Sequence, residues 1–143
     1  MLFATEEWAQ AFRAAIEASV GYRKAGASWT HVPIVLAVRA APALGLPAAV
    51  GLWLDLAGGR CREARLVTMQ EAARAPFCIE GDYADWKAVT QRRLDPIKAI
   101  LTRKLSLRGS KLTLLRYVPA ALALVDCALH VPVEFADDRK GGT

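Results

Sequence analysis

Apolar residues near the start of the chain recur every three or four positions, which is the pattern of an amphipathic helix. Thr5 is placed to cap this helix, and Glu6 and Glu7 stand in its first turn, where negative charge is favoured. The apolar positions are Trp8, Ala11, Phe12, Ala15, Ile16 and Val20. The pattern predicts a helix that begins after Thr5 and ends between Gly21 and Gly26.

Five strand-like runs follow this helix. They span residues 32–39, 50–57, 60–67, 76–80 and 104–108. In the second run Leu52, Leu54 and Leu56 hold alternate positions, a period of two that is typical of a half-buried strand. Gly58 and Gly59 join the second run to the third as a predicted hairpin. The runs together predict a sheet with one face toward water.

After the fourth run the apolar spacing returns to that of helices. Asp82 is placed to cap one helix. Asp95 and Pro96 begin another, with the proline in the first turn, where its missing N–H costs nothing. The first helix carries Tyr83, Trp86 and Val89 on one face, and the second carries Ile97, Ile100 and Leu101. Both helices are therefore predicted to pack against the sheet through one apolar side.

The last helix is predicted to begin at Ser110 and to be apolar over much of its girth. Its main apolar stripe comprises Leu112, Leu115, Val118, Leu122, Val125 and Leu129. Pro119 falls within it, where a proline removes one backbone hydrogen bond and clashes with the preceding turn, so a kink is expected there. Residues 1–136 are predicted to form a single α+β domain, followed by a disordered tail at residues 137–143.

The composition is richer in apolar side chains than a soluble domain of 143 residues needs, with 54% hydrophobic residues and a mean hydropathy of +0.21. The surplus is available to line a cavity, unless it only reflects abundant alanine, which raises the apolar count without enlarging a core. The longest uncharged apolar stretch, residues 40–54, contains Pro42, Gly45 and Pro47 and is too short to span a membrane. Because acid rather than Lys or Arg stands at the start of the chain, a cytoplasmic location is expected.

Positive charge is concentrated between Lys87 and Arg116, where nine basic residues accompany one acid, Asp95. This window carries +8, and since the net charge of the chain is +5, the remainder carries −3. Such a field favours anionic partners, namely a phospholipid surface, acyl-coenzyme phosphates or nucleic acid, although a solvated face with no partner produces the same pattern. Nucleic acid is disfavoured, because the window lacks aromatic residues at strand positions on which bases could stack.

The residue types of nucleophilic and metal sites do not fall into the patterns that such sites need. None of the serines lies in a G-x-S-x-G elbow. His31 and His130 are far apart in the sequence, with no cysteine or carboxylate at ligand spacing. Cys61, Cys78 and Cys127 show no CxxC spacing and are expected to be reduced, buried thiols.

The nearest approach to a carboxylate site is the group formed by Glu80, Asp82 and Asp85. A helix cap and a first helical turn account for Asp82 and Asp85 without catalysis. The sequence therefore predicts no catalytic residues, no metal and no cofactor.

Three short motifs in the second half of the chain form a helix, strand, helix series. They are the runs from Asp95 to Leu101 and from Lys104 to Gly109, and the pair Leu114 and Leu115. The first half adds Glu7-Trp8-Ala9 with Phe12, Leu54-Asp55-Leu56 and Cys61-Arg62-Glu63-Ala64-Arg65. In these motifs, over roughly residues 3–135, the chain resembles the sterol carrier protein type 2 family of nonspecific lipid-transfer proteins, above all its short stand-alone bacterial members.

The chain departs from the family pattern at three places. Arg103 stands where the family favours glycine, and Ser110 and Lys111 replace the usual acid after Gly109. Pro119 is the third departure, within the helix expected to line the pocket.

The resemblance implies an α+β fold with a curved, mostly antiparallel five-stranded sheet, covered by helices that enclose an apolar tunnel. Fatty acids, fatty acyl-CoA, phospholipids and sterol-like molecules are the ligands that it implies. The expected lipid-binding residues are Trp86, Val89, Ile97, Ile100, Leu101, Leu105, Leu107, Leu115, Val118 and Leu122. Arg103, Lys104, Arg108 and Lys111 are expected to meet anionic headgroups or a membrane surface.

The alternative hypothesis is a non-catalytic accessory subunit, in which the fold is kept, the pocket is closed and the apolar last helix docks on a protein partner. Bulky side chains at the lining positions, if present, would favour this role. The sequence leaves both a monomer and a homodimer open.

Overall fold

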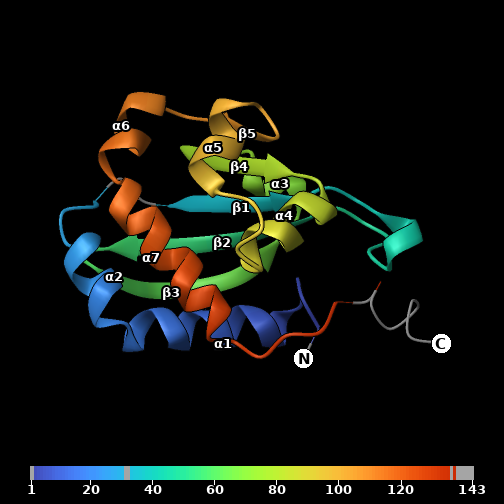
Figure 1. Ribbon diagram of the computed structural model, residues 1–143, viewed down its shortest axis with the longest axis horizontal. Coiled ribbons are helices and arrows are strands. Elements are labelled where there is room, and N and C mark those ends of the chain that lie inside the picture. Colours follow the sequence, from blue (N-terminus) through green and yellow to red (C-terminus); the bar gives the residue numbers. More distant parts are fainter. Residues whose placement is uncertain (1, 31–32, 136, 138–143) are drawn as a thin grey trace.

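The computed structural model describes residues 2–30, 33–135 and 137, and Figure 1 shows a sheet with helices packed across it. The strands are β1 (Ile34–Val38), β2 (Val50–Ala57), β3 (Arg60–Val67), β4 (Phe77–Gly81) and β5 (Leu105–Arg108). The helices are α1 (Glu6–Ala18), α2 (Val20–Ala25), α3 (Met69–Ala72), α4 (Tyr83–Thr90), α5 (Pro96–Leu101), α6 (Lys111–Arg116) and α7 (Val118–Leu129), with a 3-10 turn, η1 (Pro42–Leu44). The predicted α+β class is confirmed.

The five strands form one open sheet in the order β3-β2-β1-β4-β5. The pairs β3–β2, β2–β1 and β4–β5 are antiparallel, and the central pair β1–β4 is parallel. A parallel pair needs a crossover, which here runs through β2, β3 and α3 before the chain returns as β4. The sheet is therefore mixed, and the prediction of a mostly antiparallel sheet is confirmed.

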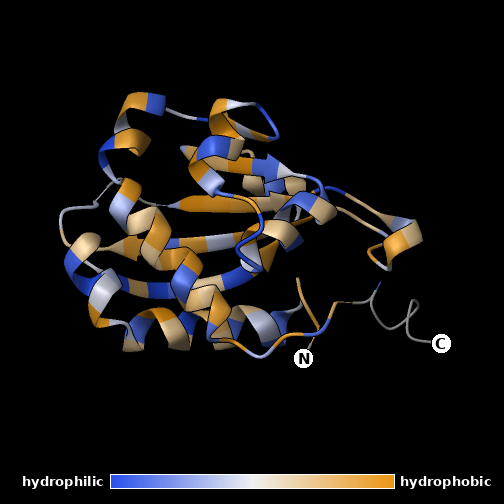
Figure 2. Ribbon diagram, viewed as in Figure 1, coloured by the Kyte–Doolittle hydropathy of each residue, from blue (hydrophilic) through white to orange (hydrophobic). Residues whose placement is uncertain are grey.

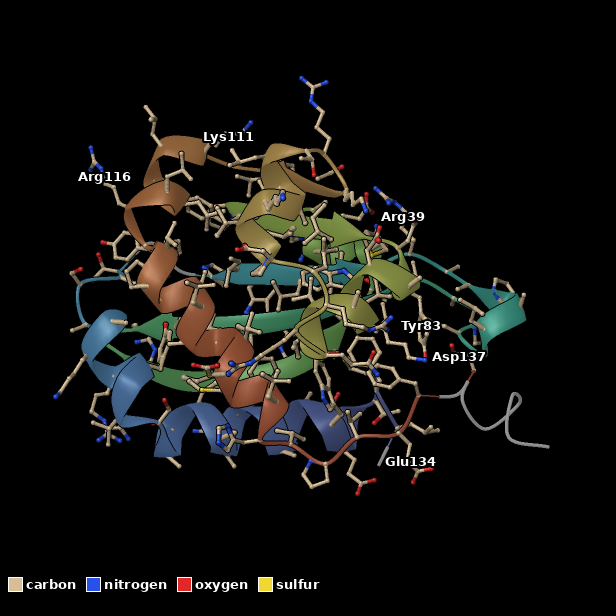
Figure 3. All side chains as sticks on the ribbon, in the orientation of Figure 1. Arg39, Tyr83, Lys111, Arg116, Glu134 and Asp137 are labelled. Atoms are coloured by element: carbon tan, nitrogen blue, oxygen red, sulfur yellow. The ribbon has the colours of Figure 1, made fainter. Side chains whose placement is uncertain are left out.

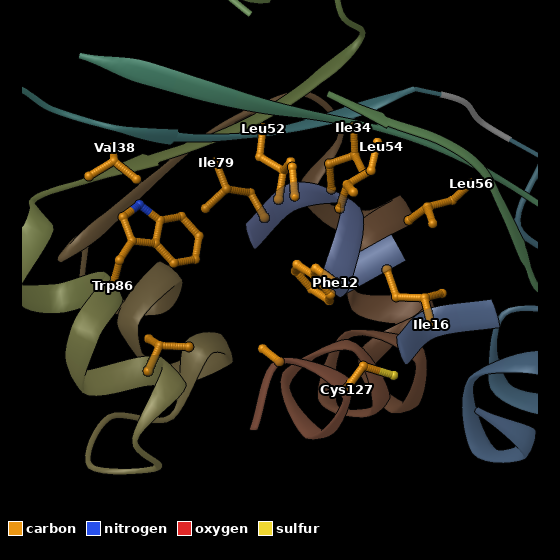
Figure 4. Close-up of a cluster of buried hydrophobic side chains, with 14 of the residues drawn as sticks. Phe12, Ile16, Ile34, Val38, Leu52, Leu54, Leu56, Ile79, Trp86 and Cys127 are labelled. Carbon is orange, nitrogen blue, oxygen red and sulfur yellow. The ribbon is translucent and has the colours of Figure 1, made fainter. Parts of the chain in front are cut away.

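The alternating leucines of β2 set the inner face of the sheet. Leu52, Leu54 and Leu56 are buried, and Figure 4 shows them turned toward Phe12 and Ile16 of α1. The period of two predicted for this strand is therefore confirmed, and burying this face against helices stabilises the fold.

The opposite face of the sheet carries a second, smaller core. Val35, Ala37, Val67 and Cys78 pack there against Ala72 of α3. The prediction that this face meets water is therefore wrong over the part that α3 covers, because the short helix after β3 gave no periodic signal in the sequence.

Two helix caps form as predicted. The Thr5 hydroxyl accepts a hydrogen bond from the Trp8 amide at 3.3 Å, and the Asp95 carboxylate accepts one from the Ile97 amide at 2.8 Å. Asp82 precedes α4, but its side chain makes no cap hydrogen bond and instead pairs with Arg39 at 3.1 Å.

Two expected helices are each divided in two. At the first break the Ser19 backbone is extended, and its hydroxyl accepts a hydrogen bond from the Tyr22 amide at 3.0 Å, which ends α1 and caps α2. At the second, Tyr117 separates α6 from α7, and Pro119 stands in the first turn of α7, where its missing N–H is harmless. The predicted kink at Pro119 is therefore a break two residues earlier.

The backbone on either side of β5 enters conformations that favour glycine. Gly109 has φ 134°, and a Cβ there would lie 2.9 Å from the Pro76 carbonyl oxygen, so a larger residue would force the strand end to shift. Arg103, at the position where the family resemblance expects glycine, has φ 65°. A left-handed conformation is unfavourable for a residue with a Cβ, so the turn before β5 holds strain.

Of the predicted disordered tail, Asp137 belongs to the described residues. Its carboxylate accepts hydrogen bonds from the Tyr83 hydroxyl at 3.1 Å and from Lys87 Nζ at 3.0 Å (Figure 3). Residues 138–143 lie outside the described residues.

No helix in the described ranges combines the length and the apolar character needed to cross a bilayer.

Replacing Leu54 with alanine should lower the free energy of unfolding by roughly 2–5 kcal/mol, because it removes a fully buried side chain from the centre of the sheet. Leu122→Ala is the matched control: Leu122 is 43% exposed, and its removal should change stability by less than about 0.5 kcal/mol. Urea unfolding of both variants makes the comparison, and equal losses would contradict this packing.

Candidate functional site

A cavity of about 120 Å³ lies between the inner face of the sheet and the helices that cover it. The strand residues on its wall include Ile34, Leu36, Leu52, Leu56, Ile79 and Leu105. The helices contribute Trp8, Phe12, Trp86, Val89, Ile100, Leu114, Ala120, Ala121 and Leu124, among others. The same alternation that builds the core therefore also builds the cavity wall.

The cavity wall is hydrocarbon, and no charged residue lines it in the described part of the chain. Several polar atoms of lining residues bond to backbone carbonyls: Trp86 Nε1 donates to Ala37 at 2.8 Å, the Thr90 hydroxyl to Lys87 at 2.9 Å and the Tyr117 hydroxyl to Ser28 at 3.0 Å. A void with such a wall offers water few partners and favours apolar contents.

Half-buried lining residues mark where the cavity approaches solvent. Ten lining residues are half-buried, and six of them belong to α4, α5 and α7: Thr90, Pro96, Ile97, Ala121, Leu124 and Val125. The other four are Leu36, Val50 and Leu66 on the strands and Tyr117 between α6 and α7. The seam between α7 and the two shorter helices, α4 and α5, therefore holds most of the half-buried part of the wall.

An ion pair crosses this seam. It joins Arg92, in the loop after α4, to Asp126 on α7, and both side chains are more than half exposed. An exposed pair of this kind contributes little to stability, so it allows the two sides to separate.

Five of the ten residues predicted to bind lipid line the cavity: Trp86, Val89, Ile97, Ile100 and Leu105. The other five, Leu101, Leu107, Leu115, Val118 and Leu122, do not. Leu101 and Leu115 are 55% and 40% exposed, and Leu107 and Val118 are half-buried. Contact between any of the ten and a lipid remains a prediction.

The break between α6 and α7 explains most of this difference. For a continuous helix we expected the large residues Leu115, Val118 and Leu122 to face inward, whereas α6 and α7 present Leu114, Ala120, Ala121, Leu124 and Val125 to the cavity. The apolar pattern of the sequence did not single out Ala120 and Ala121, because alanine occurs on both buried and exposed faces of helices. Their small volume is what keeps space open beneath α7.

The four predicted headgroup contacts do not share one environment. Arg103, Lys104 and Lys111 are exposed near the turn before β5 and at the start of α6. The guanidinium of Arg108 instead donates to the carbonyls of Ala75 at 2.6 Å and Ala72 at 2.8 Å, on the far side of the sheet. Arg108 therefore anchors the segment after α3.

The cysteines are buried, unpaired thiols, as expected. Burial raises the pKa of Cys61 to about 11 and raises the pKa values of Cys78 and Cys127 as well. Thiols with raised pKa values are weak nucleophiles near neutral pH, because the thiolate is the reactive form.

Among the described residues, histidine and carboxylate side chains do not line the cavity. His130 is exposed, with Nδ1 2.7 Å from the Asp126 carbonyl oxygen, and His31 lies outside the described residues. Glu80 and Asp82 both pair with Arg39, at 3.4 and 3.1 Å. Within the described ranges no three His, Cys, Asp or Glu side chains come together as a metal site would require.

The mixed five-stranded sheet covered by helices, together with the sequence, is what places the chain among known proteins. The chain belongs to the SCP-2 sterol transfer family, whose model matches residues 12–120. A search of curated proteins gave no significant match.

Solved structures agree with the family assignment. A crystal structure of sterol carrier protein 2 is 39% identical, with a TM-score of 0.83, and the match covers 91% of this chain and 99% of that one. The solution structure of a conserved hypothetical protein of Thermus thermophilus, described as possibly sterol carrier protein, is also 39% identical, with a TM-score of 0.83 and coverage of 94% and 92%. Apo sterol carrier protein 2 of Yarrowia lipolytica, 12% identical with a TM-score of 0.52 and coverage of 85% and 89%, shares the fold.

The raised pKa of Cys61 predicts that stability falls as pH rises from about 8.5 to about 11. Across this window the unfolded thiol loses its proton while the folded thiol keeps it, so rising pH favours the unfolded chain. Unfolding curves of the wild-type protein and of Cys61→Ala at both ends of the window should show a smaller loss for the variant. Equal losses would contradict a strongly buried thiol.

Proposed function

We propose that the protein binds one apolar lipid in the cavity beneath its helices and carries it without acting on it chemically. The single observation that carries the proposal is the uncharged hydrocarbon wall of the cavity. Membership of the sterol transfer family supports apolar lipid binding in general. Fatty acids, fatty acyl-CoA, phospholipids and sterol-like molecules are the candidate cargoes.

Desolvation would supply the affinity. Each methylene group moved from water to an apolar wall gains about 0.8 kcal/mol, so a tail can be held without polar recognition. Since no charged residue of the described part lines the cavity, a charged headgroup would stay at the surface.

The size of the cavity means that a long tail must widen it. Its volume of about 120 Å³ is close to that of apolar cavities of about 150 Å³ that accept a benzene ring. Pockets for larger ligands span roughly 300–1,000 Å³. We propose that α7 moves away from α4 and α5 as a tail enters, because the seam between them holds six of the ten half-buried lining residues.

Two adjacent residues of α7 provide a matched test. Ala121 lines the cavity, whereas Leu122 is exposed and does not. In titrations with a fluorescent fatty acid, Ala121→Trp should weaken binding about tenfold or more, because losing the burial of two methylene groups already has that effect. Leu122→Trp should bind as the wild-type protein does.

Thermal unfolding shows whether Ala121→Trp still folds. If this variant does not fold, Ile97→Trp takes its place, because Ile97 also lines the cavity but belongs to α5. The proposal fails if no acyl ligand binds the wild-type protein saturably, or if Ala121→Trp and Ile97→Trp both bind like Leu122→Trp. Native mass spectrometry of protein taken directly from cells adds a second readout. A stoichiometric protein partner with no bound small molecule would favour the accessory-subunit hypothesis, and the same spectra would distinguish a monomer from a homodimer.

A further inference from the structure

One end of the molecule combines exposed leucines with basic side chains. It comprises α5, the turn that leads to β5, and α6, which lie together at the top of Figure 1. We name this end of the molecule the basic tip. Its residues are Lys98, Leu101, Arg103, Lys104, Lys111, Leu112, Leu115 and Arg116. Leu112 is 75% exposed, the largest exposed fraction among the described large apolar residues that face solvent. Figure 3 shows Lys111 and Arg116 projecting from this end.

The charge of the basic tip is uncompensated within its own segment. Residues 96–125 contain six basic side chains and no acidic one. In the described structure no ion pair is formed by Lys98, Arg103, Lys104, Lys111 or Arg116. An anionic surface is therefore the complementary partner.

Helix α6 connects the basic tip to the cavity. Figure 2 shows hydrophilic and hydrophobic residues alternating along it. Within α6, all of which the structure describes, Leu114 is the one buried residue, and its side chain lines the cavity, while Leu112 and Leu115 face outward. The helix is bounded by Gly109 and by the break at Tyr117. A short element held by one buried side chain opens more easily than the rest of the fold.

Arg103 is one of the cations of the basic tip. This exposed residue holds φ 65°, a strained conformation that glycine would relieve. Arg103 directly follows the C-cap of α5, so this backbone conformation ends the helix and leaves the guanidinium at the surface beside Lys104.

We infer that the basic tip docks on an anionic lipid bilayer, and that docking opens the cavity at α6. Leu112 and Leu115 enter the interface beside Leu101, and the cations meet the headgroups, which is the arrangement of an interfacial amphipathic segment. Because Leu114 belongs to the same helix, inserting its neighbours withdraws it from the cavity wall. The docking step is argued from the exposed leucines and cations alone. The opening step rests on the proposed function, in which the cavity holds a lipid.

Vesicle flotation tests the docking step. The wild-type protein should float with vesicles of phosphatidylcholine and phosphatidylglycerol, and added salt should release it, whereas pure phosphatidylcholine should bind it at least tenfold more weakly. The double variant Leu112→Ser and Leu115→Ser should lose at least tenfold in binding to the anionic vesicles. Val20→Ser removes a side chain that is 59% exposed on α2, away from the basic tip, and should float like the wild-type protein.

The variant Arg103→Gly distinguishes the loss of a surface cation from a loss of stability. It should weaken flotation while leaving the melting temperature unchanged or higher, because it removes a cation and relieves the backbone. Equal flotation of the wild-type protein and the double serine variant, or flotation that does not need anionic lipid, overturns the inference. Failure to float on anionic vesicles overturns it as well, even if the basic tip binds an acidic protein.

Release of a fluorescent fatty acid from loaded protein tests the opening step. Anionic vesicles should speed release from the wild-type protein several-fold but not from the double serine variant. Flotation without faster release would overturn the opening step and leave docking in place. If no fatty acid loads at all, the proposed cargo fails, and flotation still reports on docking separately.

Discussion

Burial of the leucine face of β2 is the interaction on which the rest of the structure depends. Leu52, Leu54 and Leu56 stand at alternate positions, so a single face of the strand must leave water, and only helices lie within reach to cover it. Placing α1 against this face fixes Phe12 and Ile16, and the same face continues as the wall of the cavity. Fold and site therefore share one hydrophobic surface.

The cavity exists because the helices cover this surface without filling it. Opposite the large side chains of the sheet, α7 presents Ala120, Ala121 and Ala128. Alanine lets the helix backbone approach the sheet closely but leaves side-chain volume unused. A core with an unfilled cavity is less stable than a fully packed one, because the residues lining the cavity lose packing contacts.

The sequence predicts what is local in this fold. The Gly58-Gly59 turn and the period of two place β2 and β3 at their observed bounds, and Asp95 with Pro96 marks the start of α5. These signals succeed because the turn and the cap depend on neighbouring residues alone.

What the sequence did not predict depends on contacts between distant segments. The end of α6 coincides with Tyr117, whose ring packs edge-on against Trp29 at 4.9 Å and whose hydroxyl reaches the Ser28 carbonyl. A local sequence pattern around Tyr117 cannot predict contacts with Ser28 and Trp29, which lie almost 90 residues earlier in the chain. Leu115, Val118 and Leu122, three of the five predicted lipid-binding residues outside the cavity, lie on the two helices that meet at this break. Trp86 and Ile100, on helices predicted from local apolar spacing, lie on the cavity wall.

The placement of the four tryptophans has a practical consequence. Trp8, Trp29 and Trp86 stand on the cavity wall, whereas Trp53 lies on the opposite face of the sheet beneath the Arg65 guanidinium. Three of the four indole fluorophores of the protein thus stand beside the cavity. The molecule carries its own optical probe of whatever occupies its interior, with Trp53 as a built-in reference.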